Sequence, residues 1–352
     1  MDRQLPLILI TGAGGLIGRA LIERLRGEYR LVATHRGQPP TDGGGADWVE
    51  LDVTSNDDVT NALSGMTQRH GREFASVVHL AAYYDFKGEP SPLYEEVTVR
   101  GSERLISALQ EYEVEQFIFS STMLVHSPTE PGDEIDEDSP LEAKWDYPAS
   151  KIETERVLRQ KRGRIPLALL RIAGVYDEEG HSIPLTRQLQ RVYERQLESY
   201  VFPGDPTRGQ AFVHLADVVE ALRLTIERRH DLPVETELLI GEDETFSYQE
   251  LQEQLGELLH GREWPTVRVP ALAAKAGAWA QDVSPLGDPF IKPWMIDLAD
   301  DHYELDVSRA RELLGWQPRR SLRETLPAMV RTLQADPARF YAENDLGEAP
   351  GS

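Results

Sequence analysis

The chain has 352 residues, of which 40% are hydrophobic, 28% are charged and none is cysteine, and its formal net charge is −23. So acidic a surface repels nucleic-acid phosphates and anionic lipid headgroups, so we expect neither nucleic acid nor a membrane as a partner. The lack of cysteine excludes disulfides, thiolate catalysis and cysteine-ligated metals, and we expect no bound metal. With no apolar run of about 18 residues and no signal-peptide core, we expect a cytoplasmic protein.

Short apolar stretches alternate with stretches of helical period along the first half of the chain. Leu7 to Ile10 is a continuous apolar run typical of a buried strand, and apolar residues at 16, 17, 21, 22 and 25 follow at helical spacing. This alternation predicts an α/β fold, a Rossmann-type doubly wound parallel sheet with helices on both faces. Further strands are expected at 30–34, 48–51, 76–80, 116–120 and 167–171, and further helices at 59–63, 97–112 and 152–160.

The pattern loosens after residue 176, where we expect a second and smaller domain. A helix is expected at 184–196, and Ser or Asp followed three residues later by Glu predicts helix starts at Asp217, Ser247 and Ser321. The dinucleotide-binding domain is expected to span 1–176, with the chain returning to it at about 211–241. An α+β substrate-binding domain is expected at 177–210 and 242–340, with Trp279, Trp294 and Trp316 in its core, and a flexible tail at 343–352.

A glycine-rich turn, TGAGGLIG at 11–18, lies between the first strand and the first helix. Gly12 permits the tight turn, Gly15 lets the backbone approach a pyrophosphate, and Gly18 allows close contact between helix and strand. The N-terminus of the helix offers unpaired N–H groups and a partial positive charge to the phosphates. This placement predicts a dinucleotide site.

The end of the second strand indicates which dinucleotide binds. A carboxylate there would accept the ribose hydroxyls of NAD, but the sequence reads VATHR at 32–36. Arg36 can instead pair with the 2′-phosphate of NADP, assisted by His35 or Arg19. The sequence therefore favours NADP, with NAD as the alternative.

Tyr147 and Lys151 are four residues apart at the start of a predicted helix, and so lie on the same face. A lysine ammonium near a tyrosine favours the phenolate. Tyr147 can then act as general base toward an alcohol, or as general acid toward a ketone. The strand before this helix ends in FSST at 119–122, whose hydroxyls can hold a substrate oxygen.

In these motifs the chain resembles the extended short-chain dehydrogenase/reductase family, the NAD(P)-dependent epimerase/dehydratase group, over about residues 5–335. The matching segments are TGAGGLIG (11–18), Asp52-Val53, HLAA (79–82), FSST-x-x-V (119–125), YPASK (147–151), LRIAGVY (170–176), FVHLADV (212–218) and LD to LGWQP (305–318). The resemblance implies that Thr122 orients the substrate hydroxyl and that Tyr147 transfers the proton. Lys151 would lower the tyrosine pKa and contact the nicotinamide ribose.

The resemblance also places the cofactor and suggests how subunits pair. Asp52 and Val53 would border the adenine, and Ala81 and Ala82 would line the cofactor cleft. Leu16, Ile17 and Leu80 from the same motifs would contribute to cofactor binding. Members of the family commonly form homodimers through the helix that carries the tyrosine and its neighbour, here 97–112.

Departures from the family pattern bear on the substrate. Met123-Leu124 stands where 4,6-dehydratases carry Asp-Glu, so that dehydration lacks its acid and base. Sugar-nucleotide members hold the diphosphate with an Asn in the segment that here is 172–174, and often with an Arg where Gln210 stands. Both are missing, although Arg187 and Arg208 can compensate. His126 is interpreted as a loop residue rather than a catalyst.

Aromatic residues near the predicted site leave two interpretations open. Tyr83 and Tyr84 follow the cofactor-cleft motif directly, and Trp145 precedes Tyr147 by two residues. They can line a pocket for a ring or an apolar substrate, or they can simply pack between the domains. We include Tyr83, Tyr84, Thr122, Arg187 and Arg208 as candidate substrate residues.

We therefore expect hydride transfer between a nicotinamide and a secondary alcohol or ketone carbon of a small molecule. Arg36 and the missing diphosphate contacts favour an NADPH-dependent carbonyl reductase. The alternative is an NAD-dependent nucleotide-sugar epimerase, which would retain its cofactor. A more distant alternative is a non-catalytic NADP-sensing protein, which the presence of both Tyr147 and Lys151 disfavours.

Overall fold

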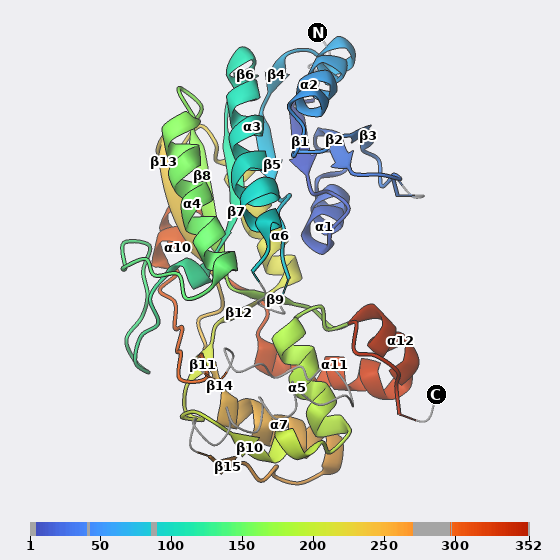
Figure 1. Cartoon of the computed structure of the whole chain (residues 1–352), viewed down its shortest axis with the longest axis vertical. Coiled ribbons are helices and arrows are strands. Elements are labelled where there is room, and N and C mark those ends of the chain that lie inside the picture. The colour runs from blue at the N-terminus through green and yellow to red at the C-terminus, as the bar shows by residue number, and fades with distance from the viewer. Residues whose placement is uncertain (1–4, 41–42, 86–89, 270–295, 297, 351–352) are drawn as a thin grey trace.

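A computed structural model of the chain describes residues 5–40, 43–85, 90–269, 296 and 298–350 (Figure 1). The centre of the molecule is a seven-stranded sheet in which every strand is parallel to its neighbours. Its strand order confirms the Rossmann-type sheet predicted from the sequence. Across the sheet the strands are β13 (Glu235–Ile240), β8 (Leu167–Ile172), β7 (Phe117–Thr122), β5 (Ser76–His79), β1 (Leu7–Thr11), β2 (Arg30–His35) and β3 (Asp47–Glu50).

Both faces of this sheet are apolar because successive strand residues point to opposite sides. In β1, Leu7 and Leu9 pack on one face, whereas Ile8 and Ile10 pack on the other. Ligands of such sheets bind at the carboxyl ends of the strands, where the loops after β1, β2, β5 and β7 meet. The first face is covered by α2 (Asn56–His70), α3 (Arg100–Ala108) and α4 (Asp146–Lys161), and the second by α1 (Leu16–Leu25), α6 (Leu215–Glu227) and α10 (Ser308–Leu314) (Figure 1).

A smaller, mainly helical unit lies below the sheet in Figure 1. Its helices α5 (Ile183–Tyr193), α7 (Tyr248–His260), α11 (Leu322–Ala335) and α12 (Pro337–Glu343) share one apolar core. Two short strand pairs accompany them, β10 (Val201–Phe202) with β15 (Val267–Arg268) and β11 (Gly209–Gln210) with β14 (Phe246–Ser247). The remaining elements are the parallel pairs β9 (Gly174–Tyr176) with β12 (Phe212–His214) and β4 (Glu73–Phe74) with β6 (Glu113–Val114), and the short helical turns η1 (Tyr94–Val99), η2 (Leu109–Glu111), η3 (Met123–Val125) and η4 (Leu197–Tyr200).

The chain returns to the sheet twice after leaving it. In the first return, β13 pairs with β8 and α6 packs on α1. In the second, Trp316 is buried in the core shared with α1 and α6, and its indole N–H donates to the Asp217 carbonyl at 2.9 Å. The expectation that Trp316 belongs to the core of the smaller domain is therefore wrong, because α10 brings it back to β13 and α6. Trp279 and Trp294 lie outside the described residues.

Two of the three predicted helix starts, Ser247 and Ser321, are confirmed, and the third, Asp217, is wrong. At Ser247 both bonds of a capping box with Glu250 are present, and at Ser321 the side chain accepts from the Glu324 N–H. Helix α6, however, begins at Leu215, where the His214 imidazole accepts from the Ala216 N–H at 3.1 Å. Asp217 does not begin this helix, because its buried carboxylate instead accepts the backbone N–H groups of residues 319 and 320 at 3.1 and 3.0 Å.

The C-terminal segment differs from the expected flexible tail as far as residue 350. Leu346 and Ala349 are buried in the core of the smaller unit. Gln190 of α5 donates to the Leu346 carbonyl at 3.1 Å. The two buried apolar side chains and this hydrogen bond fix the segment against α5.

Glu242 is a buried carboxylate where the two units meet. It accepts hydrogen bonds from the Tyr176 hydroxyl at 2.6 Å and from the Leu322 N–H at 2.8 Å. Burial raises its pKa from 4.5 to about 7, and the nearby charges of Asp217 and Glu244 add to the rise. The folded chain therefore holds this proton more tightly than the unfolded chain, so its stabilising contribution is complete below pH 4.5 and is lost as pH approaches 7.

We expect Glu242→Gln, which mimics the neutral carboxyl, to remove this pH dependence. The variant should equal the parent near pH 5 and be more stable at pH 8 by on the order of 2 kcal/mol. Urea unfolding at both pH values measures the difference. Glu257→Gln removes an equal charge at an exposed site of α7 and serves as control. Parallel pH profiles for the parent and Glu242→Gln would contradict the assignment.

Candidate functional site

The glycine turn after β1 has the geometry that a dinucleotide pyrophosphate requires. Gly12 has φ +67°, and a Cβ there would lie 2.6 Å from the Ala81 nitrogen. A Cβ on Gly18 would lie 2.6 Å from Ala13 Cα, so α1 packs closely on the turn. Gly14 has open space around it, and Gly15 caps α1 without a side-chain hydrogen bond. The N-terminal N–H groups of α1 therefore face outward, and the turn fits a phosphate group.

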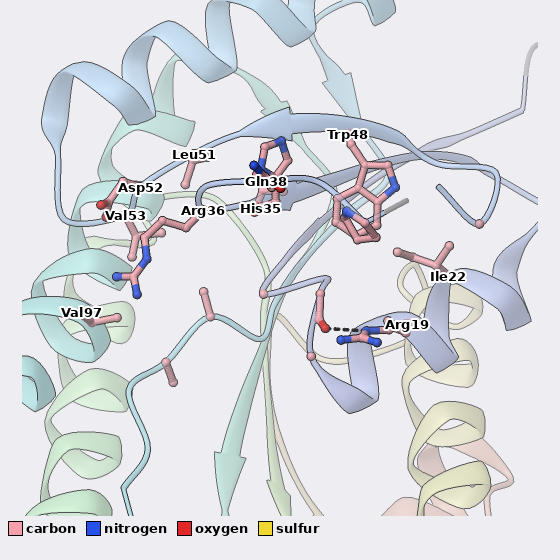
Figure 2. A pocket seen from close by; sticks show the side chains of 18 of the residues that line it. Arg19, Ile22, His35, Arg36, Gln38, Trp48, Leu51, Asp52, Val53 and Val97 are labelled. Atoms are coloured by element: carbon pink, nitrogen blue, oxygen red, sulfur yellow. Dashed lines mark hydrogen bonds between the residues drawn. The ribbon is translucent and has the colours of Figure 1, made fainter. Parts of the chain in front are cut away.

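A cavity of about 890 Å³ opens at this turn, along the ends of β1, β2 and β3 (Figure 2). Its walls combine backbone at the turn with apolar side chains and a few charged ones, a lining suited to an adenine nucleotide. Of the residues predicted to bind the cofactor, Leu16, Ile17, Gly18, Leu80, Tyr147 and Lys151 are described but are not part of the lining. The predicted residues that line it are Gly12, Gly15, Arg19, His35, Arg36, Asp52, Val53, Ala81, Ala82 and Tyr83, and residues not predicted include Trp48, Leu93 and Val97.

Two arginines reach this cavity from different elements. Arg36, just after β2, is exposed and extends toward Asp52 and Val53 (Figure 2). Arg19, on α1, donates from Nε to the Gly14 carbonyl at 2.6 Å and so lies against the glycine turn. Hydrogen bonds from Thr54 keep the pKa of Asp52 below its usual value, and the charge of Arg36 contributes. The cavity thus offers the guanidinium groups of Arg19 and Arg36 and the carboxylates of Asp52 and Glu23 to a bound nucleotide.

Thr122, Tyr147 and Lys151 come together where β7 ends beside the first turns of α4. Burial raises the pKa of Tyr147 to about 12, and a hydrogen bond with the Thr122 hydroxyl opposes this rise. The Lys151 Nζ donates to the Ser120 carbonyl at 2.7 Å and lies 5.7 Å from the centre of the Tyr147 ring. Burial lowers the pKa of Lys151 to about 7, so its charge is only partly present at neutral pH. The phenol is therefore in its proton-donating form in the chain alone.

Aromatic side chains connect this trio with the cavity. Tyr83 lines the cavity and packs edge-on against Tyr94 at 4.8 Å between ring centres. The next residue, Tyr84, is 47% exposed and lies edge-on to Tyr147 at 4.8 Å. Trp145 lies 5.5 Å from the same ring. Tyr84 and Trp145 therefore flank the phenol, whereas Tyr83 packs on Tyr94 and does not contact Tyr147 among the ring contacts of the described residues.

The buried side chain of His79, for which the sequence predicted no role, is hydrogen-bonded to Thr11 at the start of the glycine turn. The Ser102 hydroxyl donates to the Thr98 carbonyl at 2.5 Å, so it accepts from His79 Nε2 at 2.9 Å. His79 Nδ1 then accepts from the Thr11 hydroxyl at 2.6 Å. Burial lowers the pKa of His79 to about 3, and the Lys151 charge contributes, so the ring stays neutral. The HLAA motif contained this residue, but its role depends on partners distant in sequence.

Comparison with known proteins agrees with this geometry. The family model described as the NAD dependent epimerase/dehydratase family matches residues 8–241. The chain belongs to this family. It is therefore a nicotinamide-dependent enzyme of the extended short-chain dehydrogenase/reductase type, as the sequence motifs predicted.

Relatives of this family member are similar over nearly their whole length. UDP-glucose 4-epimerase of Streptomyces lividans is 24% identical over 336 residues, which cover 89% of this chain and 92% of that protein. The 3 beta-hydroxysteroid dehydrogenase type 7 of Mus musculus is 24% identical, covering 94% of this chain and 97% of that protein. UDP-glucuronic acid 4-epimerase of Bacillus cereus, solved with UDP-glucuronic acid and NAD, is 20% identical and superposes with a TM-score of 0.70 over 94% of this chain and 99% of its own.

The two arginines proposed for substrate diphosphate bind other groups in this family member. Arg208 forms an ion pair with Glu130 of the acidic loop and donates to the Thr129 carbonyl at 3.4 Å. Arg187 on α5 donates to the Asp345 carbonyl at 2.6 Å. Neither is part of the cavity lining in the described part of the chain. The structure therefore brings together the predicted catalytic trio but not these two candidates.

No helix in the described part of the chain is both long and apolar enough to span a bilayer. The same part of the chain holds no group of three or more His, Cys, Asp or Glu arranged to bind a metal ion.

Proposed function

We propose that this enzyme epimerises a nucleotide-activated sugar by oxidising and re-reducing one secondary alcohol carbon. The observation that carries the proposal is the trio of Thr122, Tyr147 and Lys151 beside a cavity of dinucleotide size. Relatives similar along nearly their whole length are named as UDP-glucose 4-epimerases. They support the epimerase, which the sequence offered as the alternative, better than the carbonyl reductase that it favoured.

The residues of the trio have distinct roles in this proposal. A nicotinamide cofactor held at the glycine turn would supply the acceptor, and later the donor, of the hydride. Thr122 holds the substrate hydroxyl, and Tyr147 takes the hydroxyl proton as the C–H bond breaks, which leaves a ketone. The protonated phenol then returns this proton to the oxygen when the carbon is reduced. The Lys151 ammonium stabilises the phenolate, which is the form of Tyr147 before it takes the proton and again after it has returned it.

A reductase that consumes NADPH is the second candidate, and a specific observation favours it. Arg19 and Arg36 both line the cavity, and the end of β2 carries no carboxylate for the ribose hydroxyls of NAD. Arg187 binds the Asp345 carbonyl and Arg208 pairs with Glu130, so neither arginine contributes to binding a substrate diphosphate in this proposal. On these grounds NADP is our proposed cofactor if the enzyme is a reductase, and NAD, the alternative, is the cofactor expected of the epimerase.

One purification and two assays separate the candidates. The protein is purified without added nucleotide, and any dinucleotide released on denaturation is identified. The protein is then incubated with UDP-glucose or UDP-glucuronic acid, and the C4 epimers are separated by chromatography. Retained dinucleotide and a new epimer support the epimerase. An empty site with NADPH oxidation on a panel of ketones supports the reductase, and binding of neither dinucleotide contradicts both.

We expect Arg36→Ser to reduce the affinity for NADP by about 10- to 100-fold, because a charge-assisted pair with the 2′-phosphate contributes about 1.5–3 kcal/mol. The affinity for NAD should change less than threefold, roughly, since that ribose carries no phosphate. Calorimetric titration with both dinucleotides measures the two constants. Arg331→Ser, on the exposed face of α11, changes the net charge equally. An equal loss for both dinucleotides would contradict a role in phosphate recognition.

Two further properties belong to this proposal. A homodimer through α4 and residues 97–112 follows from the family resemblance, and light scattering coupled to size-exclusion chromatography tests it. A cytoplasmic location stays a prediction from the sequence.

A further inference from the structure

One face of α4 meets the end of β7 in three successive contacts. Tyr147, Lys151 and Glu155 share this face because they are spaced by four residues. Tyr147 is hydrogen-bonded to Thr122, and Lys151 Nζ donates to the Ser120 carbonyl at 2.7 Å. In the third contact, the hydroxyl of the intervening residue, Ser121, donates to Glu155 Oε1 at 2.6 Å. The carboxylate thus binds the residue directly before Thr122.

Glu155 is itself fixed by charge. Its side chain is 1% exposed, and Arg171 of β8, 3% exposed, donates to both carboxylate oxygens at 3.2 and 2.9 Å. Arg159 approaches Oε2 at 3.4 Å. Burial opposes ionisation of Glu155, but the hydrogen bonds and charge of Arg171 outweigh it and keep the pKa below its usual value. A buried ion pair of this kind is rigid, because separating it leaves an uncompensated charge.

Arg171 is held in turn by the segment that follows β7. One of its terminal nitrogens donates to His126 Nε2 at 3.1 Å and to the Glu137 carbonyl at 2.8 Å. His126 Nδ1 then donates to the Ser139 carbonyl at 3.1 Å. Burial lowers the pKa of His126 to about 4, with the charge of Arg171 contributing, so the ring is a neutral structural partner. The Glu155 carboxylate is therefore anchored from β8 and from the loop after β7.

We propose that Glu155 is a positioning residue of the active site, which through Ser121 fixes the end of β7 so that the Thr122 hydroxyl stays in contact with Tyr147. This inference rests on the proposed function, since it concerns the same trio. A misplacement of about 1 Å between reacting groups can reduce turnover by about 100-fold, so a rigid support here affects kcat rather than substrate binding.

Ser121→Ala is the variant that tests the proposal, because it removes the third contact and leaves the Glu155–Arg171 pair intact. Protein labelled with ¹³Cζ-tyrosine reports the Tyr147 phenol by NMR, and Tyr147→Phe assigns its signal. We expect Ser121→Ala to move this signal in the same direction as Thr122→Val does. Turnover of UDP-glucose should fall by about 10- to 100-fold in kcat, with KM within about twofold.

Thr154→Ala is the matched control. Thr154 is also buried on α4, but its hydroxyl donates only to the Ser150 carbonyl of the same helix, at 2.7 Å, among the bonds of the described residues. It should leave the Tyr147 signal and the kcat unchanged. Glu155→Gln should shift the same signal, and Ser121→Ala keeps the test available if that variant does not fold.

Three outcomes are decisive. A folded Ser121→Ala with an unmoved Tyr147 signal would overturn the proposal, as would an equal shift in Thr154→Ala. A moved signal in Ser121→Ala and Glu155→Gln alone supports it. If the parent protein transfers no hydride, the proposed function fails, whereas the NMR comparison still decides whether Glu155 positions Thr122.

Discussion

Tyr147→Phe is expected to reduce turnover by about 10²- to 10⁴-fold, which is the contribution of a positioned acid–base group. The substitution removes only the phenol oxygen, which exchanges the proton with the substrate hydroxyl. The ring keeps its contacts with Tyr84 at 4.8 Å and Trp145 at 5.5 Å. The fold and the cofactor affinity should therefore persist. Epimer formation from UDP-glucose, or NADPH oxidation with a ketone, measures the loss.

Tyr112→Phe provides the control for this result. It removes the same atom from a ring that packs on Phe74 at 6.1 Å, away from the cavity lining. Turnover of that variant should equal the parent. If Tyr147→Phe kept full turnover, proton transfer through this residue would be excluded and the mechanism above would be wrong. The dinucleotide affinity, measured on the same samples, separates a chemical defect from a binding defect.

The central sheet and the glycine turn could be predicted because local sequence carries them. The buried run Leu7 to Ile10 and the turn after it are specified by residues adjacent in the chain. The spacing of Tyr147 and Lys151 likewise fixes their shared face of α4. The strand that presents Thr122 lies next to α4 because the helix of a βαβ crossover packs back onto the sheet with one hand. Such features need no knowledge of distant contacts.

Other features could not be predicted because they depend on pairs that are far apart in sequence. Asp217 looked like a helix start, but its carboxylate binds backbone groups 102 and 103 residues away. Trp316 packs beneath α6 for the same reason, since the chain returns to the sheet near its end. From the sequence, Arg208 was a candidate for binding a substrate diphosphate. The fold instead pairs its charge with Glu130. The spacing of apolar residues along the chain cannot predict these contacts, because it reports only on residues that are near one another in sequence.

For the catalytic trio, too, the sequence predicts one part of the chemistry and the fold determines the rest. Its residue types and spacing indicated acid–base chemistry, and the structure brings the three side chains together. The sequence could not give the desolvation that raises the pKa of Tyr147 to about 12 and lowers that of Lys151 to about 7. These two shifts oppose the simple expectation that a nearby ammonium activates the phenol. A positively charged ligand beside Tyr147 would have to supply part of that activation.

Gly12→Ala is expected to be the most damaging small substitution in the cofactor site. A methyl group there would lie 2.6 Å from the Ala81 nitrogen and 2.7 Å from the Leu80 carbonyl carbon, both backbone atoms. The residue would also keep a φ of +67°, which side chains other than glycine rarely adopt. Strain and overpacking together should cost about 2–5 kcal/mol of unfolding free energy. Dinucleotide binding should fall below detection, because relieving the clash moves the turn away from the cavity.

Gly14→Ala, two residues along the same turn, is the matched control for stability. No heavy atom lies within 4 Å of its added methyl group, and its φ is not in the left-handed region. Its unfolding free energy should stay within about 0.5 kcal/mol of the parent, or rise slightly, because alanine restricts the unfolded chain. Urea unfolding of both variants gives the comparison. If Gly12→Ala were as stable as Gly14→Ala and still bound dinucleotide, the close approach of the turn to the loop after β5 would not be what shapes the site.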